Sequence, residues 1–244
     1  MSRYRKWGYG LGIATVTAVS AFGVASWQAN AAPNPPAPSG AAVTQPRVSD
    51  PKAAPEPVSG KGDDSLTTSE VAKARAAAVT PQLASGAKNV AGEAGPEYLS
   101  AEVDAEGSAG RQAELYYYDY RTNKLFKQVV DLKTGKLAKS FSAAKMQPPA
   151  SEREAAVALD LLLADPLGAD FKTAYQKATG KPLAGKEGLV PMAHIYTSKP
   201  ADTGAKQCGA SRCVQLIVQS ADGHFINVNE LIVDLSGRKI ARLT

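Results

Sequence analysis

Histidine and cysteine are scarce in this sequence, since each occurs only twice in 244 residues. A metal centre built on imidazole usually needs three histidines, or two with a carboxylate, so His194 and His224 make a poor ligand set. A serine or cysteine nucleophile needs a base and an orienting group, but no Gly-x-Ser-x-Gly motif occurs. The Gly-rich stretch 86–95 lacks the Lys-Ser/Thr ending of a phosphate-binding loop. The sequence therefore predicts no enzyme, no catalytic residue, no metal site and no cofactor.

An excess of positive charge is also missing once the N-terminus is set aside. The chain has 28 Lys+Arg and 23 Asp+Glu, a net charge of +5. Three of the basic residues, Arg3, Arg5 and Lys6, lie in a leading segment without acidic residues, so the remainder has 25 against 23, a net charge of +2. Binding to nucleic acid would need basic residues gathered with base-reading side chains. We expect no nucleic-acid partner.

The N-terminal 31 residues have the three parts of a secretory signal peptide. The basic start is followed by an apolar stretch over 11–27 and by Ala29-Asn30-Ala31, an A-x-A cleavage site. The apolar stretch is shorter and more polar than the roughly 20 residues of a membrane-spanning helix, although a retained anchor is the alternative. The sequence has no twin-arginine pair and no cysteine at the cleavage site, so we expect export by the general secretion route. We expect the chain to contact the membrane only through the signal peptide. The mature protein should be secreted or associated with the cell wall.

Residues 32–65 are rich in proline, alanine, serine and glycine. Such a segment has too little apolar surface to offset the entropy of ordering it. It predicts a disordered Pro/Ala linker, which could give reach through a cell wall or act as a plain spacer.

The remainder contains the same pattern twice, over 66–147 and 148–244. Each half begins with a Ser/Thr-x-x-Glu capping box, at Thr67–Glu70 and Ser151–Glu154, and a proline follows each helix. Strand-like runs come next, and the second half has room for an extra helix. The expected helices are 67–79, 155–164 and 169–179, and the expected strands are 98–103, 112–120, 125–132, 137–141, 189–197, 213–220, 225–235 and 239–243.

Two hairpins are the clearest sign of duplication. Both have an apolar strand, Asp-Leu, a glycine turn and a basic-apolar strand, at 129–138 and 232–241. The aspartates, Asp131 and Asp234, are expected to cap these turns. Apolar residues change phase within 225–235, which predicts a bulge near Glu230. The fold class is α+β, with each helix packed across its own antiparallel sheet.

The two cysteines, Cys208 and Cys213, lie close together in the exported part. In an oxidising compartment they predict a disulfide. A loop this small contributes only about 2 kcal/mol by the chain-entropy argument, so the bond fixes a local turn.

An aromatic run, Tyr116-Tyr117-Tyr118-Asp119-Tyr120, is the most distinctive local feature. In a strand, Tyr116, Tyr118 and Tyr120 share one face. They either pack in the core with their hydroxyls reaching the surface or form an exposed patch for a partner or glycan.

Four short segments carry a family resemblance: 118–123, 129–132, 147–149 and 163–166. Together they resemble the tandem cystatin-like domains that precede the catalytic domain of copper amine oxidases, each a helix on an antiparallel sheet. The chain also resembles mostly uncharacterised exported proteins of GC-rich Gram-positive bacteria, whose pattern ends with a cysteine pair and a Val-Asp-Leu strand. The resemblance covers about 66–244 and implies two tandem cystatin-like units.

The catalytic features of copper amine oxidases are missing from this sequence. That family needs a tyrosine within Asn-Tyr-Asp/Glu, three copper-binding histidines and a catalytic aspartate in a large later domain. No tyrosine here follows an asparagine. We expect an exported, non-catalytic interaction or structural module whose partner is an extracellular protein or a cell-wall component. The alternatives are an accessory or degenerate relative of these oxidases that handles copper, and a protease inhibitor of cystatin-like fold. For the inhibitor, 128–132 lacks the glycine of Gln-x-Val-x-Gly.

Overall fold

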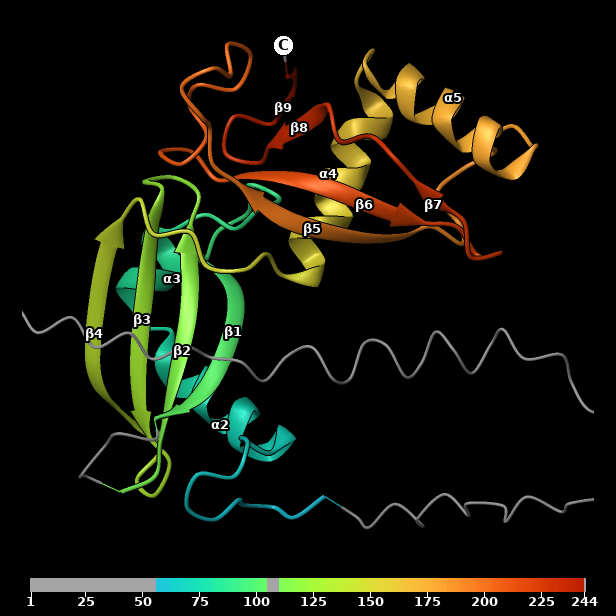
Figure 1. Ribbon diagram of the computed structural model, residues 1–244. Coiled ribbons are helices and arrows are strands. Elements are labelled where there is room, and N and C mark those ends of the chain that lie inside the picture. Colours follow the sequence, from blue (N-terminus) through green and yellow to red (C-terminus); the bar gives the residue numbers. More distant parts are fainter. Residues whose placement is uncertain (1–55, 105–109, 244) are drawn as a thin grey trace, which may run out of the picture. The chain divides into compact units, whose positions relative to one another are not determined.

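The computed structural model describes residues 56–104 and 110–243, whose helices and strands are drawn in Figure 1. The expected signal peptide, 1–31, and the linker up to residue 55 lie outside the described residues. Two antiparallel sheets with helices give the α+β fold that the sequence predicts. Within the described part, no helix is both long and apolar enough to cross a membrane.

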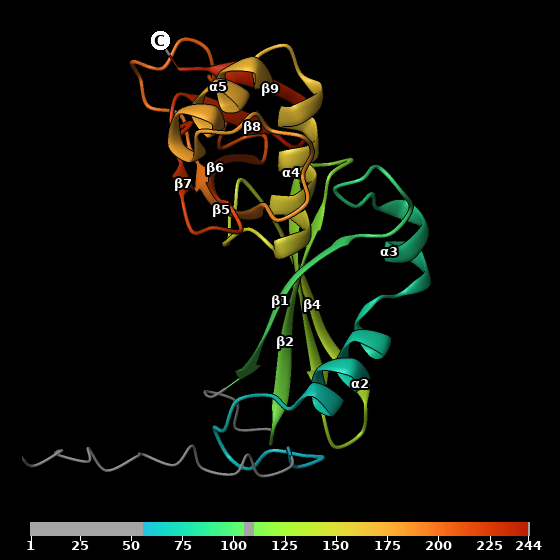
Figure 2. The same ribbon diagram turned by 90° about the vertical axis from the view of Figure 1, so that its right-hand side faces the viewer.

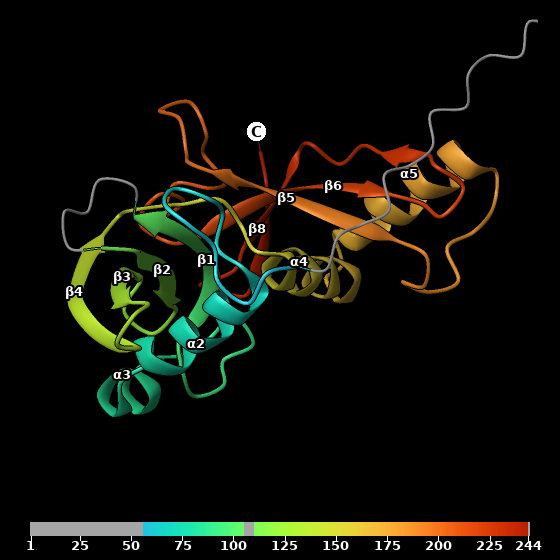
Figure 3. The same ribbon diagram turned by 90° about the horizontal axis from the view of Figure 1, so that it is seen from below.

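The first sheet has four antiparallel strands in the order β1-β2-β3-β4. Two helices lie on one face of this sheet (Figures 2 and 3). The elements are α2 (Thr68–Ala78), α3 (Pro81–Gly86), β1 (Glu97–Asp104), β2 (Gln112–Asp119), β3 (Lys124–Asp131) and β4 (Lys136–Ala144).

Helix α2 begins at the predicted capping box. Thr67 Oγ1 accepts a hydrogen bond from the Glu70 amide at 3.1 Å, and Glu70 Oε2 accepts one from the Thr67 amide at 3.0 Å. The buried face of the helix carries Ala74 and Ala78, whose small side chains let the helix lie close to the sheet. The sheet residues of this core are Ala113, Leu115, Tyr117, Val130 and Leu132.

Helix α3 was not expected from the sequence, which uses Thr80-Pro81 only as a stop for the preceding helix. Helix α2 does end at Ala78, but Pro81 also begins a new helix. Thr80 Oγ1 caps it by accepting from the Leu83 amide at 3.2 Å. Proline suits this first position because its missing N–H would have no partner inside the helix.

The second sheet has the strand order β5-β6-β8-β9, with β7 paired to β6. Helix α4 packs on this sheet, and Gly180, with φ of 72°, ends the extra helix α5 as predicted. The core contains Leu159, Leu162 and Phe171 from the helices and Leu216, Val218 and Val233 from the strands. The elements are α4 (Glu152–Ala164), α5 (Gly168–Thr179), β5 (Val190–Tyr196), β6 (Cys213–Gln219), β7 (Phe225–Ile226), β8 (Leu231–Asp234) and β9 (Lys239–Arg242).

The expected strand 225–235 is broken in two, which is a larger change than the predicted bulge. Ile226 pairs with Val218, and Ile232 pairs with Gln215. Between these two pairs the segment from Ile226 to Ile232 advances by six residues, while β6 advances by only three. Three residues of the segment therefore loop out. The Leu231 amide closes this loop by donating to the Val228 carbonyl at 2.9 Å. Because of this loop, the apolar residues before it, such as Ile226, and those after it, such as Val233, all reach the core.

The close approach of α2 to its sheet can be tested with two matched substitutions. Ala74→Leu adds a large side chain at a fully buried position and should lower the free energy of unfolding by about 1–3 kcal/mol through overpacking. Ala76→Leu places the same residue on the exposed side of the same helix and should change it by less than about 0.5 kcal/mol. Urea denaturation measures both, and equal effects would contradict the helix-on-sheet packing.

Candidate functional site

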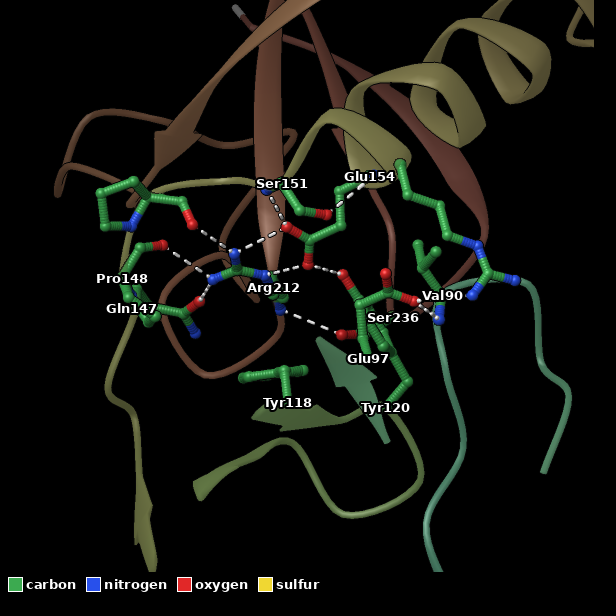
Figure 4. Close-up of polar contacts among 12 residues, drawn as sticks. Val90, Glu97, Tyr118, Tyr120, Gln147, Pro148, Ser151, Glu154, Arg212 and Ser236 are labelled. Carbon is green, nitrogen blue, oxygen red and sulfur yellow. Dashed lines mark hydrogen bonds and ion pairs between the residues drawn. The ribbon is translucent and has the colours of Figure 1, made fainter. Parts of the chain in front are cut away.

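A fully buried ion pair lies at the start of strand β6. Arg212 Nε lies 2.5 Å from Glu154 Oε1, and Arg212 Nη2 lies 2.8 Å from Glu154 Oε2. Both side chains are 0% exposed. Figure 4 shows the guanidinium and the carboxylate facing each other edge to edge. This is the two-point geometry that makes arginine–carboxylate pairs strong and specific.

The helix cap fixes the position of the carboxylate. Glu154 is the third residue of α4, and its Oε2 accepts from the Ser151 amide at 2.7 Å. In return, the Glu154 amide donates to Ser151 Oγ at 3.1 Å. The predicted capping box therefore also presents the anion for Arg212.

The remaining donors of Arg212 bind the chain that leads into α4. Nη1 donates to the Pro148 carbonyl at 3.0 Å and to Gln147 Oε1 at 3.3 Å, and Nη2 donates to the Pro149 carbonyl at 3.1 Å. Each proline offers a carbonyl but has no N–H that would need a partner of its own. Arg212 thereby holds both the start of the helix and the segment before it.

The same arrangement occurs in the first half of the chain. Arg111 directly precedes β2, as Arg212 directly precedes β6. Its Nε and Nη2 each lie 2.9 Å from a carboxylate oxygen of Glu70, the capping-box residue of α2. Its other bonds reach the Gly62 and Ser65 carbonyls, just before the helix. We call each set, Glu70 with Arg111 and Glu154 with Arg212, a Glu–Arg clamp.

Backbone contacts complete the match between the two clamps. The Arg111 carbonyl accepts from the Leu132 amide at 3.2 Å, and the Arg212 carbonyl accepts from the Leu235 amide at 3.0 Å. These leucines belong to the repeated Asp-Leu pairs. The aspartates cap the following turns as predicted, with Asp131 accepting from the Thr134 amide and Asp234 from the Gly237 amide. The duplication thus extends from sequence to side-chain contacts.

Two tyrosines from the first sheet contact the second clamp. Tyr120 donates its hydroxyl to Glu154 Oε1 at 2.5 Å, and the Tyr118 ring lies 5.1 Å below the Arg212 guanidinium. Burial, with the nearby Glu154 charge, raises the pKa of Tyr120. The phenol therefore remains a hydrogen-bond donor, and the end of β2 is joined to α4 and β6.

Of the two alternatives for the tyrosine run, core packing describes Tyr118 and Tyr120, and Tyr116, Tyr118 and Tyr120 do not form one exposed patch. Tyr118 is fully buried and Tyr120 is partly buried in the second core. Tyr116 is half-buried, and its hydroxyl donates to Glu114 Oε2 at 2.9 Å. The structure differs from the patch because Arg212 covers Tyr118, and Arg212 is almost a hundred residues away in sequence.

The disulfide between Cys208 and Cys213 is present, as predicted, with a Cα–Cα distance of 5.4 Å. Both cysteines are buried, and Cys213 is the first residue of β6. The loop they close ends at Arg212, and Ser211 donates its amide to the Gln207 carbonyl at 2.8 Å. The bond therefore fixes the turn that delivers Arg212 to Glu154.

Both histidines are exposed, His194 on β5 and His224 directly before β7. The nearest acidic partner of His224 is Asp222, at 3.9 Å. Across the described residues, no group of three or more histidine, cysteine, aspartate or glutamate side chains is placed to hold a metal ion. For the inhibitor alternative, Gln128 is buried in the middle of β3.

A cleft of about 560 Å³ lies beside the cap of α4. A buried carboxylate, Glu97, lines it together with the exposed Arg153, whose Nη1 is 3.6 Å away. Burial raises the pKa of Glu97, while a hydrogen bond from the Val90 amide at 3.1 Å opposes the rise. The cleft also contains Arg75, stacked 4.1 Å over Tyr98. Its lining of both charges suits a zwitterionic or polar molecule.

The outer edge of β4 is the most open surface of the first sheet. All residues of this strand except Leu137 are exposed. Phe141 is 54% exposed and Met146, just beyond the strand, is 53% exposed. Large apolar side chains at this degree of exposure are typical of interaction surfaces when they cluster.

The fold of this chain is similar to that of solved structures, whereas its sequence matches no protein-family model and no curated protein. A copper-containing benzylamine oxidase from Hansenula polymorpha is similar in fold, with 14% sequence identity and a TM-score of 0.40 over 75% of this chain. The chain spans 30% of that protein's length. This similarity agrees with the resemblance to copper amine oxidases. The resemblance to exported Gram-positive proteins stays a prediction.

The second clamp should be costly to break from one side. Arg212→Met leaves Glu154 buried without its partner and should lower the free energy of unfolding by about 3–5 kcal/mol. Arg111→Met should cost less, because the Arg111 side chain retains 15% exposure and water can reach the site. Glu154→Leu combined with Arg212→Met removes both charges and should recover part of the loss. Urea denaturation measures all three, and equal costs for the two arginines would contradict the difference in burial.

The first clamp should make stability depend on acid. The hydrogen bond from Arg111 lowers the pKa of Glu70 from 4.5 to about 2. The ionised form therefore stabilises the folded state fully above pH 4.5, and this contribution is lost as the pH falls towards 2. Glu70→Gln should flatten the dependence of the unfolding midpoint on pH in this window. Glu152→Gln, at an exposed position of the α4 cap, is the matched control and should leave the dependence unchanged.

Proposed function

We propose that this chain is an exported, non-catalytic interaction module that works outside the cytoplasmic membrane. The observation that carries the proposal is how the buried charges are used. Among the described residues, each of the six buried charged side chains is held by a helix cap, a clamp or a turn: Glu70, Glu97, Asp119, Glu154, Arg212 and Asp234. Groups that catalyse proton transfer need access to a substrate. Glu97 and Asp119 line hollows but accept hydrogen bonds from backbone amides there, and the other four groups hold the fold away from any hollow described above.

The disulfide supports the proposed compartment. Bonds of this kind persist in oxidising surroundings and are rare in the cytosol, and here the bond orders the turn beside the second clamp. The A-x-A site at 29–31 supports export by the same reasoning. The partner would be an extracellular protein or a cell-wall component.

Secretion and partner capture test the proposal together. The full precursor is expressed in a Gram-positive host, and the medium and cell wall are analysed separately. We expect a mature N-terminus near Ala32, a linked Cys208–Cys213 peptide by mass spectrometry, and a specific crosslinked partner outside the cell. Retention in the cytoplasm with both thiols free would overturn the proposal.

Copper binding is the outcome that favours the competing function. The mature protein is titrated with Cu(II) in a calorimeter, alone and as His194→Ala and His224→Ala. Under the proposal, the titration shows no tight Cu(II) site that depends on His194 or His224. One-to-one binding at about micromolar affinity or tighter, lost in a histidine variant, would support a copper-handling protein instead.

A further inference from the structure

Strand β4 is a free edge of the first sheet. Among the described residues it pairs only with β3. Its register with β3 shifts once, opposite Val129 and Val130, and is regular from Lys139 to Ala144. An edge strand presents a row of unpaired N–H and C=O groups to a second chain. The regular stretch, six residues long, is the part suited to strand addition.

The other edges of the two sheets are less open. In β5, Pro191 removes one N–H donor. In β1, the register is interrupted between Tyr98 and Ser100. Strand β9 has only four residues. Strand β4 is thus the longest edge with a regular stretch and an exposed surface.

A hollow of about 300 Å³ lies on the face of the sheet away from α2 and α3. Phe141 and Ala143 point to this face, because they pair with Lys127 and Leu125 on β3. The lining is mostly apolar, and Lys127 is already paired with Glu114. The full lining is Tyr116, Leu125, Lys127, Phe141, Ser142, Ala143 and Met146. This hollow suits an apolar side chain.

A second hollow, of about 310 Å³, lies on the helix side of the same strand. Ser140 reaches it from β4, and Lys124 and Arg121 add two exposed cations. Gln128 also lines it, and its buried Oε1 has no hydrogen-bond partner. The carboxylate in the lining, Asp119, is occupied by the Lys88 and Arg121 amides and the Thr122 hydroxyl. This hollow suits an acidic side chain.

The charge along the edge of β4 also favours an acidic partner. The segment 132–150 contains four lysines and no aspartate or glutamate, and three of the lysines are Lys136, Lys139 and Lys145 on or next to β4. A second copy of this chain would bring the lysines of two such edges together without carboxylates from either strand. An acidic partner would neutralise them.

We propose that β4 binds an extended protein segment by strand addition, and that the segment alternates apolar and acidic side chains. The backbone of the segment pairs with Lys139–Ala144. Its alternate side chains, which point to opposite faces, enter the apolar hollow beside Phe141 and the basic hollow beside Lys124. Backbone pairing supplies affinity and the two hollows supply specificity. This rests on the proposed function, since it names the class of partner and the surface used.

A synthetic probe tests this directly on the mature, full-length chain. The probe is a labelled, N-acetylated nonapeptide alternating glutamate and valine, and the controls are its lysine–valine counterpart and a version with methylated backbone nitrogens. Fluorescence anisotropy should show saturable binding of the first peptide alone. Hydrogen exchange should show new protection within 139–144 when the peptide is bound.

Matched variants separate the two hollows from general effects. Phe141→Ala and Lys124→Glu should each weaken binding by roughly tenfold or more. Phe225→Ala, at a residue 62% exposed on β7, and Lys172→Glu, on the exposed side of α5, should leave binding within about twofold. All four positions are exposed or half-exposed, so thermal denaturation should show that each variant folds.

Several outcomes would overturn the strand-addition proposal: no binding of the glutamate–valine peptide, equal binding of the methylated peptide, equal affinities for all four variants, or protection of 139–144 before peptide is added. A dimer in solution that Phe141→Ala dissolves would assign the edge to a second copy. If the extracellular partner is still captured by Phe141→Ala and Lys124→Glu, the interaction function stands and the choice of surface fails. If the peptide binds but the protein is not exported, the strand-addition surface stands and the proposed exported function fails.

Discussion

Two Glu–Arg clamps, the first partly exposed and the second fully buried, set the geometry on which the rest of this fold depends. In each, the glutamate that caps a helix receives the arginine that precedes the second strand of the adjoining sheet. The clamp therefore determines where the helix begins relative to the sheet, and the remaining arginine donors hold the chain before the helix. Apolar packing alone would tolerate sliding of the helix along the sheet, because it is non-directional, whereas a two-point ion pair has one geometry.

A buried ion pair is weak evidence of net stability, because the cost of removing two charges from water can equal their attraction. Its effect here is better described as specification. A shifted helix would leave Glu154 and Arg212 buried and unpaired, so alternatives to the native arrangement are penalised by several kcal/mol. The tyrosines extend this constraint, since Tyr120 donates to Glu154 from the end of β2. The second clamp thus connects elements of both sheets, whereas the first clamp connects elements of only one.

Features governed by neighbouring residues could be predicted from the sequence, and features governed by distant ones could not. The capping boxes predicted the start of α2 to within one residue. They also predicted the cap of α4, although α4 begins at Glu152 and not at the expected residue 155. The repeated Asp-Leu turns predicted the two hairpins. The clamps join residues 41 and 58 positions apart, and no local pattern pairs a particular arginine with a particular glutamate. The sequence left open whether Tyr118 is buried or exposed for the same reason, because the residue that covers it, Arg212, is distant in the chain. Helix α3 and the broken strand 225–235 were missed because a proline can end one helix and begin another, and because three extra residues fit a loop as well as a bulge.

The two halves of the duplication have diverged in what they leave exposed. In the second half the clamp is fully buried, a disulfide fixes its arginine, and the last strand, β9, has four residues. In the first half the clamp remains partly open and the corresponding strand, β4, has nine residues, almost all exposed. Exposed edges favour aggregation and are usually shortened or charged, and β4 carries lysines along with Phe141. Retention of a long edge with an apolar side chain opposes that general tendency. Because the first clamp holds α2 on the other side of the sheet, the apolar face of β4 remains open to a partner.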